Sequence, residues 1–328
     1  MSTPSTPRIF AILPRDGQQA VIFRRGPSRL VQLISWDLHS DSFQPGQWLK
    51  GRIYERRCDL SPSGKLLIYF AANQKPPYYT WTAISKPPFL TALALWSCCG
   101  TWLGGGLFTS ETSAVVRGDF LEKGSVPDHF FITSLITVTK LADTPGPLSV
   151  SWHERDGTLS PPIVLTGLTQ HTSDQPIYAM RLQRDGWRLT QPGRFPPSSR
   201  RTSGDNKLRH PFETPEIYCK SNLLADGRIF DLQMKTLGFG DEAGPRNLTE
   251  YQVIDHDHNL VVDLGKIDWA DWDRNGDLLY TESGQMFRLS PDPQTPSVFD
   301  IQNARSLYDF RNAKFTEVPP TPEALYWD

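Results

Sequence analysis

The sequence predicts an all-β protein, and three observations lead to this fold class. The 328 residues include 10 Trp, 17 Phe and 10 Tyr, together with 28 Pro and 24 Gly. Aromatic residues favour strands, whereas Pro and Gly favour the turns between them. Turns of the hairpin type recur along the chain. Finally, no stretch of ten or more residues has a convincing 3.6-residue hydrophobic period, so we expect few helices.

The recurring feature is a polar turn that ends in Gly, in most cases directly before an apolar stretch. Such turns end at Gly17, Gly64, Gly157, Gly186, Gly227 and Gly276. Gly tolerates the positive φ angle that tight hairpin turns require. Intervals of 47, 41 and 49 residues separate three pairs of neighbouring turns. A period of about 40 to 50 residues is typical of four-stranded propeller blades. The sequence therefore predicts a single β-propeller domain over residues 1–328, with about five or six four-stranded blades.

Two segments show the blade pattern most clearly. Residues 58–70 read CDLSPSGKLLIYF, and residues 267–280 read IDWADWDRNGDLLY. The first resembles a phrase of TolB-type and WD-repeat-like propellers, and the second resembles a variant of it. This resemblance implies the fold and brings no catalytic residues with it. A run of three glycines at 104–106 precedes a strand-like stretch, and we interpret it as a close approach of the backbone inside a blade.

Two other segments are expected to lie outside the blades. Residues 193–210 are polar, basic and rich in Pro and Ser, which predicts an exposed loop. The chain from about residue 318 onward predicts an extended tail, since it contains Val318-Pro-Pro-Thr-Pro.

The composition restricts the expected compartment and partners. The net charge is −2, so no overall attraction to nucleic acid or anionic membrane is expected. The four cysteines contain no C-x-x-C pair, which favours reduced thiols. The first residues lack an apolar signal core, and no apolar stretch of about 18 residues follows. We therefore expect a cytoplasmic protein without a cofactor and without a membrane partner.

One motif matches a known metal-binding pattern. The segment from residue 271 to 282 fits the calcium-loop pattern D-x-[DN]-x-[DN]-G-x₅-E at its fixed positions. The candidate ligands are Asp271, Asp273, Asn275, Asp277 and Glu282. Calcium loops of this type connect two helices, whereas the flanks here read as strands. A hairpin turn at Asn275-Gly276 explains the same residues, and we favour this interpretation.

Candidate interaction residues are the aromatic and basic types that anchor interfaces. They are Trp96, Trp102, Trp152, Arg200 and Arg201. The alternative for the tryptophans is packing between blades. The alternative for the arginines is a solvated loop. The same loop is the only candidate for a contact with nucleic acid, and we do not expect this protein to bind nucleic acid.

No catalytic pattern stands out. The nucleophile-elbow pattern G-x-S-x-G is absent, and no pair of carboxylates is singled out. The leading hypothesis is therefore a non-catalytic protein–protein interaction or scaffold subunit of an intracellular multi-protein system. As an analogy from the fold alone, bacterial intracellular propellers often act in multi-subunit systems, including ATPase-linked and defence-related ones. The alternative is a metal-dependent, hydrolase- or lactonase-like propeller enzyme.

Overall fold

The computed structural model describes most of the chain, with gaps. The described residues are 6–26, 29–98, 100–101, 104–117, 137–140, 148–154, 156–165, 176–196, 210–224, 227–241, 244–255, 259–291 and 299–327. The chain divides into two compact units. Unit 1 comprises Met1–Leu168, Asp174–Arg181 and Phe310–Asp328, and unit 2 comprises Thr169–Ser173 and Leu182–Asp309. The single-domain expectation stays a prediction.

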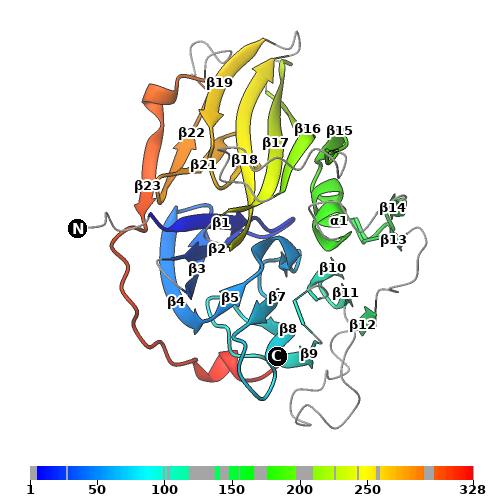
Figure 1. Ribbon diagram of the computed structural model, residues 1–328, viewed down its shortest axis with the longest axis vertical. Helices are drawn as coiled ribbons and strands as arrows, with labels where there is room; N and C mark the ends of the chain where they lie inside the picture. The colour runs from blue at the N-terminus through cyan, green and yellow to red at the C-terminus, as the bar shows by residue number, and fades with distance from the viewer. Residues whose placement is uncertain are drawn as a thin grey trace. The chain divides into compact units, whose positions relative to one another are not determined.

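Unit 1 begins with a four-stranded antiparallel sheet in sequence order (Figure 1). Its strands are β1 (Arg8–Ile12), β2 (Gln19–Arg25), β3 (Leu30–Asp37) and β4 (Ser42–Lys50). The second sheet contains β5 (Arg52–Ile53), β6 (Asp59–Leu60), β7 (Leu67–Ala72), β8 (Thr80–Ser85) and β9 (Ala94–Ser97), and the short helix η1 (Glu55–Arg57) lies between β5 and β6. Every residue of β7 and β8 is buried, so both faces of this sheet are covered.

Two smaller sheets follow in unit 1. One contains β10 (Gly106–Ser110), β11 (Ser113–Val116) and β12 (Thr137–Lys140), and the other contains β13 (Leu148–Val150) and β14 (Ile163–Leu165). Strands β11 and β12 run parallel, whereas the pairs β10–β11 and β13–β14 are antiparallel. The third sheet therefore departs from the simple antiparallel order of the first two.

The first two sheets touch through the backbone of their turns. The amides of Asp16 and Gly17, between β1 and β2, both donate to the carbonyl oxygen of Pro62, at 2.8 and 3.0 Å. A Cβ on Gly17 would overlap the carbonyl oxygen of Ser63, and a Cβ on Gly64 would overlap that of Gln19. The space between the two turns therefore requires both glycines, and Gly64 also has a positive φ of 84°.

The glycine run at 104–106 also allows a close approach. A Cβ on Gly104 would overlap the ring of Phe70, and a Cβ on Gly105 would overlap the carbonyl oxygen of Arg57. Both glycines have positive φ, at 131° and 98°. The close backbone approach that the sequence predicts is present, and it joins the second and third sheets of unit 1.

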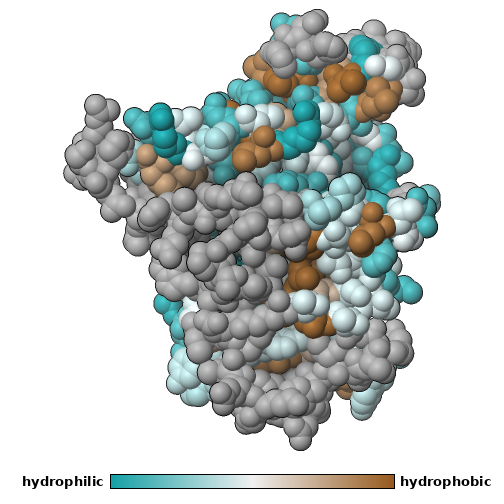
Figure 2. Space-filling model, turned by 90° about the vertical axis from the view of Figure 1, so that its right-hand side faces the viewer, coloured by the Kyte–Doolittle hydropathy of each residue, from teal (hydrophilic) through white to brown (hydrophobic). Residues whose placement is uncertain are grey.

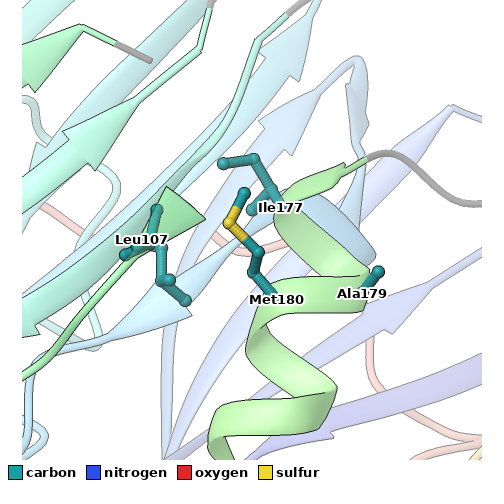
Figure 3. Close-up of a cluster of buried hydrophobic side chains, with 5 residues drawn as sticks. Leu107, Ile177, Ala179 and Met180 are labelled. Atoms are coloured by element: carbon teal, nitrogen blue, oxygen red, sulfur yellow. The ribbon is translucent and has the colours of Figure 1, made fainter. Parts of the chain in front are cut away.

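Helix α1 (Pro176–Arg184) is the one α-helix among the described residues. Its first residues pack in unit 1 against β10, where Ile177 and Met180 project toward Leu107 (Figure 3). The helix ends in a Schellman motif, because the amide of Gly186 donates to Gln183 and that of Trp187 to Leu182. The predicted hairpin turn at Gly186 is therefore wrong, and its positive φ of 90° serves a helix cap.

The last part of the chain returns to unit 1 as an extended segment, drawn in red along β4 (Figure 1). The carbonyl oxygen of Phe310 accepts a bond from the buried Arg24, and Phe315 packs on Trp48. Further along, the carbonyl of Val318 accepts from Gln47. The predicted tail from about residue 318 lies in this segment, which ends with a short turn of 3₁₀ helix, η5 (Pro322–Ala324).

Unit 2 contains two antiparallel sheets. The first is a five-stranded meander of β15 (Arg188–Gln191), β16 (His210–Leu223), β17 (Ile229–Asp241), β18 (Gly244–Asp255) and β19 (Leu260–Gly265). The second contains β20 (Ala270–Trp272), β21 (Leu278–Glu282), β22 (Gln285–Leu289) and β23 (Arg305–Asp309), and η4 (Ile301–Asn303) precedes β23. Phe299 contacts the rings of Phe230 and Trp272 at 5.2 and 5.5 Å in the core of this unit.

The predicted fold class is confirmed at the level of the sheets. The chain is mostly β, with several antiparallel sheets that follow one another in sequence order. These sheets are compatible with a propeller, but no sheet among the described residues closes on itself, and the blade number stays a prediction. Most of the predicted loop at 193–210, namely residues 197–209, lies outside the described residues.

Candidate functional site

The predicted calcium ligands lie in and around the hairpin of β20 and β21. Trp272 pairs with Leu278 at the end of the two strands, and the amide of Asp273 donates to the carbonyl oxygen of Asp277. The carboxylate of Asp273 accepts from the amides of Asn275 and Asp277, which closes the turn. The segment is thus a hairpin turn between strands, as the favoured interpretation of the sequence predicts.

Cationic side chains contact three of the four candidate carboxylates. One nitrogen of the Arg288 guanidinium bonds to both Asp273 and Asp277, the latter at 2.7 Å. The ammonium of Lys220 lies 2.7 Å from Asp271. Glu282 and Asn275 are exposed. No group of three or more metal-ligating side chains is found within the described ranges.

Burial raises the pKa of Asp271, and the nearby charge of Asp185 adds to this effect, whereas Lys220 opposes it. The ion pair with Lys220 therefore holds the carboxylate of Asp271 in a buried environment that disfavours its negative charge. It also joins the two sheets of unit 2, because Lys220 lies on β16 and Asp271 on β20. The ring nitrogen of Trp272 adds a second link by donating to the carbonyl oxygen of Lys220 at 3.0 Å.

Calcium is expected to leave the thermal unfolding of the full chain unchanged, because Arg288 already bonds to both central carboxylates. Differential scanning fluorimetry with calcium and with a chelator measures this. The Arg288→Met variant is expected to lose about 3 kcal/mol of stability, since it leaves two carboxylates without their cation. A melting temperature of the wild type that rises steadily with calcium concentration would instead support the predicted calcium site.

A second polar site, which the sequence did not single out, lies around η1 in unit 1. We call it the arginine cluster. Its members are six arginines and two tyrosines: Arg8, Arg25, Arg52, Arg56, Arg57, Arg181, Tyr54 and Tyr178. Arg52 and Arg57 each lie over the ring of Tyr54 at 5.0 Å. Arg56 and Arg181 lie over the ring of Tyr178 at 4.7 and 5.1 Å.

Glu55 is the acidic residue at the centre of this cluster. Burial pushes the pKa of Glu55 upward, but the positive charges of Arg25, Arg8 and Arg52 oppose this, and the net result is a lowered pKa. The buried Arg181 donates to the carbonyl oxygen of Cys58, whose thiol pKa is raised to about 12, chiefly by burial. The thiol therefore stays protonated at neutral pH, and the charge of the cluster comes from its arginines and Glu55.

The lowered pKa of Glu55 predicts a pH dependence of stability. A carboxyl whose pKa is lower in the folded state stabilises that state above its unfolded pKa of about 4.3, and this contribution is lost as pH falls. Urea unfolding should therefore show Glu55→Gln less stable than wild type at pH 7, by about 2 kcal/mol, with the gap narrowing toward acid pH. The exposed Glu317→Gln serves as the control, and an equal gap at all pH values would contradict the assignment.

Two of the predicted interaction residues, Trp96 and Trp152, lie in the part of the chain that the structure describes. Trp96 is partly buried and packs against the hydrophobic cluster that includes Ile68 and Phe108. Trp152 is partly buried, and its ring nitrogen donates to Glu154 at 2.9 Å. Trp102, Arg200 and Arg201 lie outside the described residues.

An exposed apolar group lies at one end of the β15–β19 sheet instead. We call it the leucine–isoleucine group, and it consists of Leu223, Ile229 and Leu260, which are 67%, 42% and 58% exposed. Leu223 pairs with Ile229 in register, and Leu260 pairs with Ile254, which itself pairs with Asp231. Leu223 and Ile229 share a face because they are direct cross-strand partners, and Leu260 lies at the same end of the sheet, beyond a register shift between Val253 and Ile254.

The opposite face of this sheet carries the core of unit 2. Phe230, Leu232 and Val253 are buried there. An alternating pattern would place polar residues on the outer face, and the leucine–isoleucine group breaks that pattern at one end of the sheet. The alternation of apolar and polar residues could have indicated this group, provided that the strand register was also known. On the face drawn in Figure 2, hydrophobic side chains occur in small groups among polar ones.

Comparisons with known proteins place the chain close to no characterised family. No family model matches the chain, and no curated protein matches it. Among solved structures, an uncharacterized protein from Listeria monocytogenes EGD-e is 9% identical with a TM-score of 0.37, covering 96% of this chain and 98% of its own. A putative 6-phosphogluconolactonase from Bacteroides fragilis NCTC 9343 is 10% identical with a TM-score of 0.33, covering 94% and 98%.

A hypothetical protein from Leishmania major is 10% identical with a TM-score of 0.28, covering 88% of this chain and 85% of its own. Scores this low carry no argument about function or blade number. Among the described residues, no helix has the length and apolar character to cross a membrane.

Proposed function

We propose that the chain is a non-catalytic interaction or scaffold subunit that binds another protein through the leucine–isoleucine group of unit 2. The observation that carries this proposal is the position of three large exposed apolar side chains at one end of one sheet. Single exposed leucines are ordinary on protein surfaces. Several together on a rigid sheet are typical of a contact surface for a partner.

The surroundings of the group support a protein partner. Asp231 lies on the face of Leu223 and Ile229 and accepts a bond from Ser221, and the guanidinium of the exposed Arg188 lies 3.9 Å from its carboxylate. An apolar centre with a polar rim is the usual composition of a protein interface. Such a centre loses its contact with water on binding, which supplies the driving force.

In this proposal the chain serves in the cytoplasm as part of a multi-protein system, in keeping with the roles of the propeller families that its sequence resembles. The ATPase-linked and defence-related roles belong to the same analogy. No contact among the described residues favours the metal-dependent enzyme, which we therefore do not propose.

Replacing Leu260 by Lys should abolish capture of the partner, because a charge would be placed in the apolar centre. The measurement is affinity purification of the tagged full chain from its native cells, with co-purifying proteins quantified by mass spectrometry. Wild type should retain a stoichiometric partner, and Leu260→Lys should retain about tenfold less. Stability should change by only about 0.5 kcal/mol, since the side chain is exposed.

Leu159→Lys is the matched control, because Leu159 is 63% exposed and belongs to unit 1. This variant should capture the partner as well as wild type does. Equal capture by both variants, or a clean monomer with no retained partner, would contradict the proposal.

A further inference from the structure

A proline-containing segment of unit 1 lies extended and outside every strand. Residues 313–321 form neither strand nor helix, and residues 318–322 read Val-Pro-Pro-Thr-Pro. The proline ring fixes φ at about −65°, and a residue that precedes a proline is driven to extended angles. Thr321, which precedes Pro322, has a φ of −74° and a ψ of 161°. These angles lie in the region of the polyproline II helix. We call residues 315–326 the proline segment.

Contacts with the sheets of unit 1 hold the proline segment on both sides of its prolines. Before them, the carbonyl oxygen of Val318 accepts a bond from the side chain of Gln47 at 3.1 Å. After them, the carbonyl oxygen of Glu323 accepts a bond from the ammonium of Lys86 at 2.9 Å, and Ala324 is buried. The conformation is therefore fixed before any partner arrives, so binding does not include the entropy cost of ordering the segment.

The prolines between these two contacts present one edge to solvent. A polyproline II helix has three residues per turn, so residues three apart lie on the same edge. Pro319 and Pro322 are three apart, and both are exposed. Pro320 lies between them and is only partly exposed. The spacing Pro-x-x-Pro thus places two proline rings on the open edge of the segment.

Larger exposed apolar side chains flank the prolines along the chain. Phe315 is 44% exposed, and its ring lies 5.9 Å from that of Trp48 on β4, which holds it in place. Leu325 and Tyr326 follow the prolines and are 45% and 70% exposed. Exposed apolar groups that gather on one fixed segment are typical of a contact surface for another protein.

The residue type and the backbone conformation together indicate the kind of partner. Proline has no backbone N–H, so Pro319, Pro320 and Pro322 cannot donate to the ladder of an added strand. SH3 and WW domains instead bind Pro-x-x-Pro segments in the polyproline II conformation, through grooves lined by aromatic rings. We propose that the proline segment is the ligand of a partner domain that has such an aromatic-lined groove. This surface belongs to unit 1, whereas the leucine–isoleucine group belongs to unit 2.

Biolayer interferometry of the immobilised full chain tests the proposal, with a panel of purified SH3 and WW domains as probes. At least one probe should bind the wild-type chain. A synthetic peptide of residues 315–326 should compete with the chain for that probe. No binding by any probe would overturn the proposal, and so would binding that the peptide does not reduce.

Pro319→Ala should weaken binding of that probe about tenfold, because it removes one of the two rings that pack into the groove. Pro320→Ala is the matched control, since it makes the same substitution at the partly covered position. It should bind within about twofold of wild type, because the contacts on both sides still hold the segment. Equal weakening by the two variants would show an effect of chain stiffness alone and overturn the docking edge.

Leu260→Lys separates this proposal from that of the leucine–isoleucine group. Leu260 belongs to unit 2, so this variant should bind the probe as wild type does. Loss of probe binding in Leu260→Lys would place the contact outside the proline segment and overturn the proposal.

A second measurement uses the wild-type chain and needs no variant. Hydrogen exchange followed by mass spectrometry compares the chain with and without the bound probe. The amides of Glu317, Val318 and Thr321 should exchange more slowly with the probe present, whereas the peptide that contains the exposed Leu159 should not change. Unchanged exchange in the proline segment at a saturating probe concentration would contradict the proposal.

Discussion

Backbone contact between successive turns determines how the first two sheets of unit 1 lie against each other. The amides of Asp16 and Gly17 bond to Pro62, and neither Gly17 nor Gly64 has room for a Cβ. Both strands that follow these turns, β2 and β7, are almost completely buried. The position of η1 depends on the same contacts, because η1 leads through Cys58 into β6, which ends just before the second turn. The arginine cluster is thus built on rigid sheets.

The two units use positive charge in different ways. In unit 2, Arg288 bonds to two carboxylates of the turn between β20 and β21, and Lys220 bonds to one on β20, so a motif that resembles a calcium loop is stabilised by cations of the chain itself. In unit 1, two tyrosine rings hold four arginines near η1, and other arginines of the cluster act on Glu55. Ion pairs such as those of Arg288 and Lys220 contribute to the specificity of packing.

The sequence predicted the sheets well where the signal was local. The turns at Gly17, Gly64, Gly227 and Gly276 lie between consecutive strands, as the sequence predicts. Such turns can be predicted because a few neighbouring polar residues and a Gly determine their conformation. Gly186 misled the prediction, since a helix cap and a hairpin turn both require positive φ and the helix before it has only nine residues. The arginine cluster and the leucine–isoleucine group could not be predicted, because each joins residues from strands whose register the sequence does not reveal.

Amide hydrogen exchange of Asp16 and Gly17 tests the central contact most directly. Both residues lie in a turn, where amides ordinarily exchange rapidly with solvent. If their bonds to Pro62 hold the two sheets together, the two amides should exchange as slowly as those in the middle of β2. Exchange at the rate of an open loop, while β2 stays protected, would contradict the account.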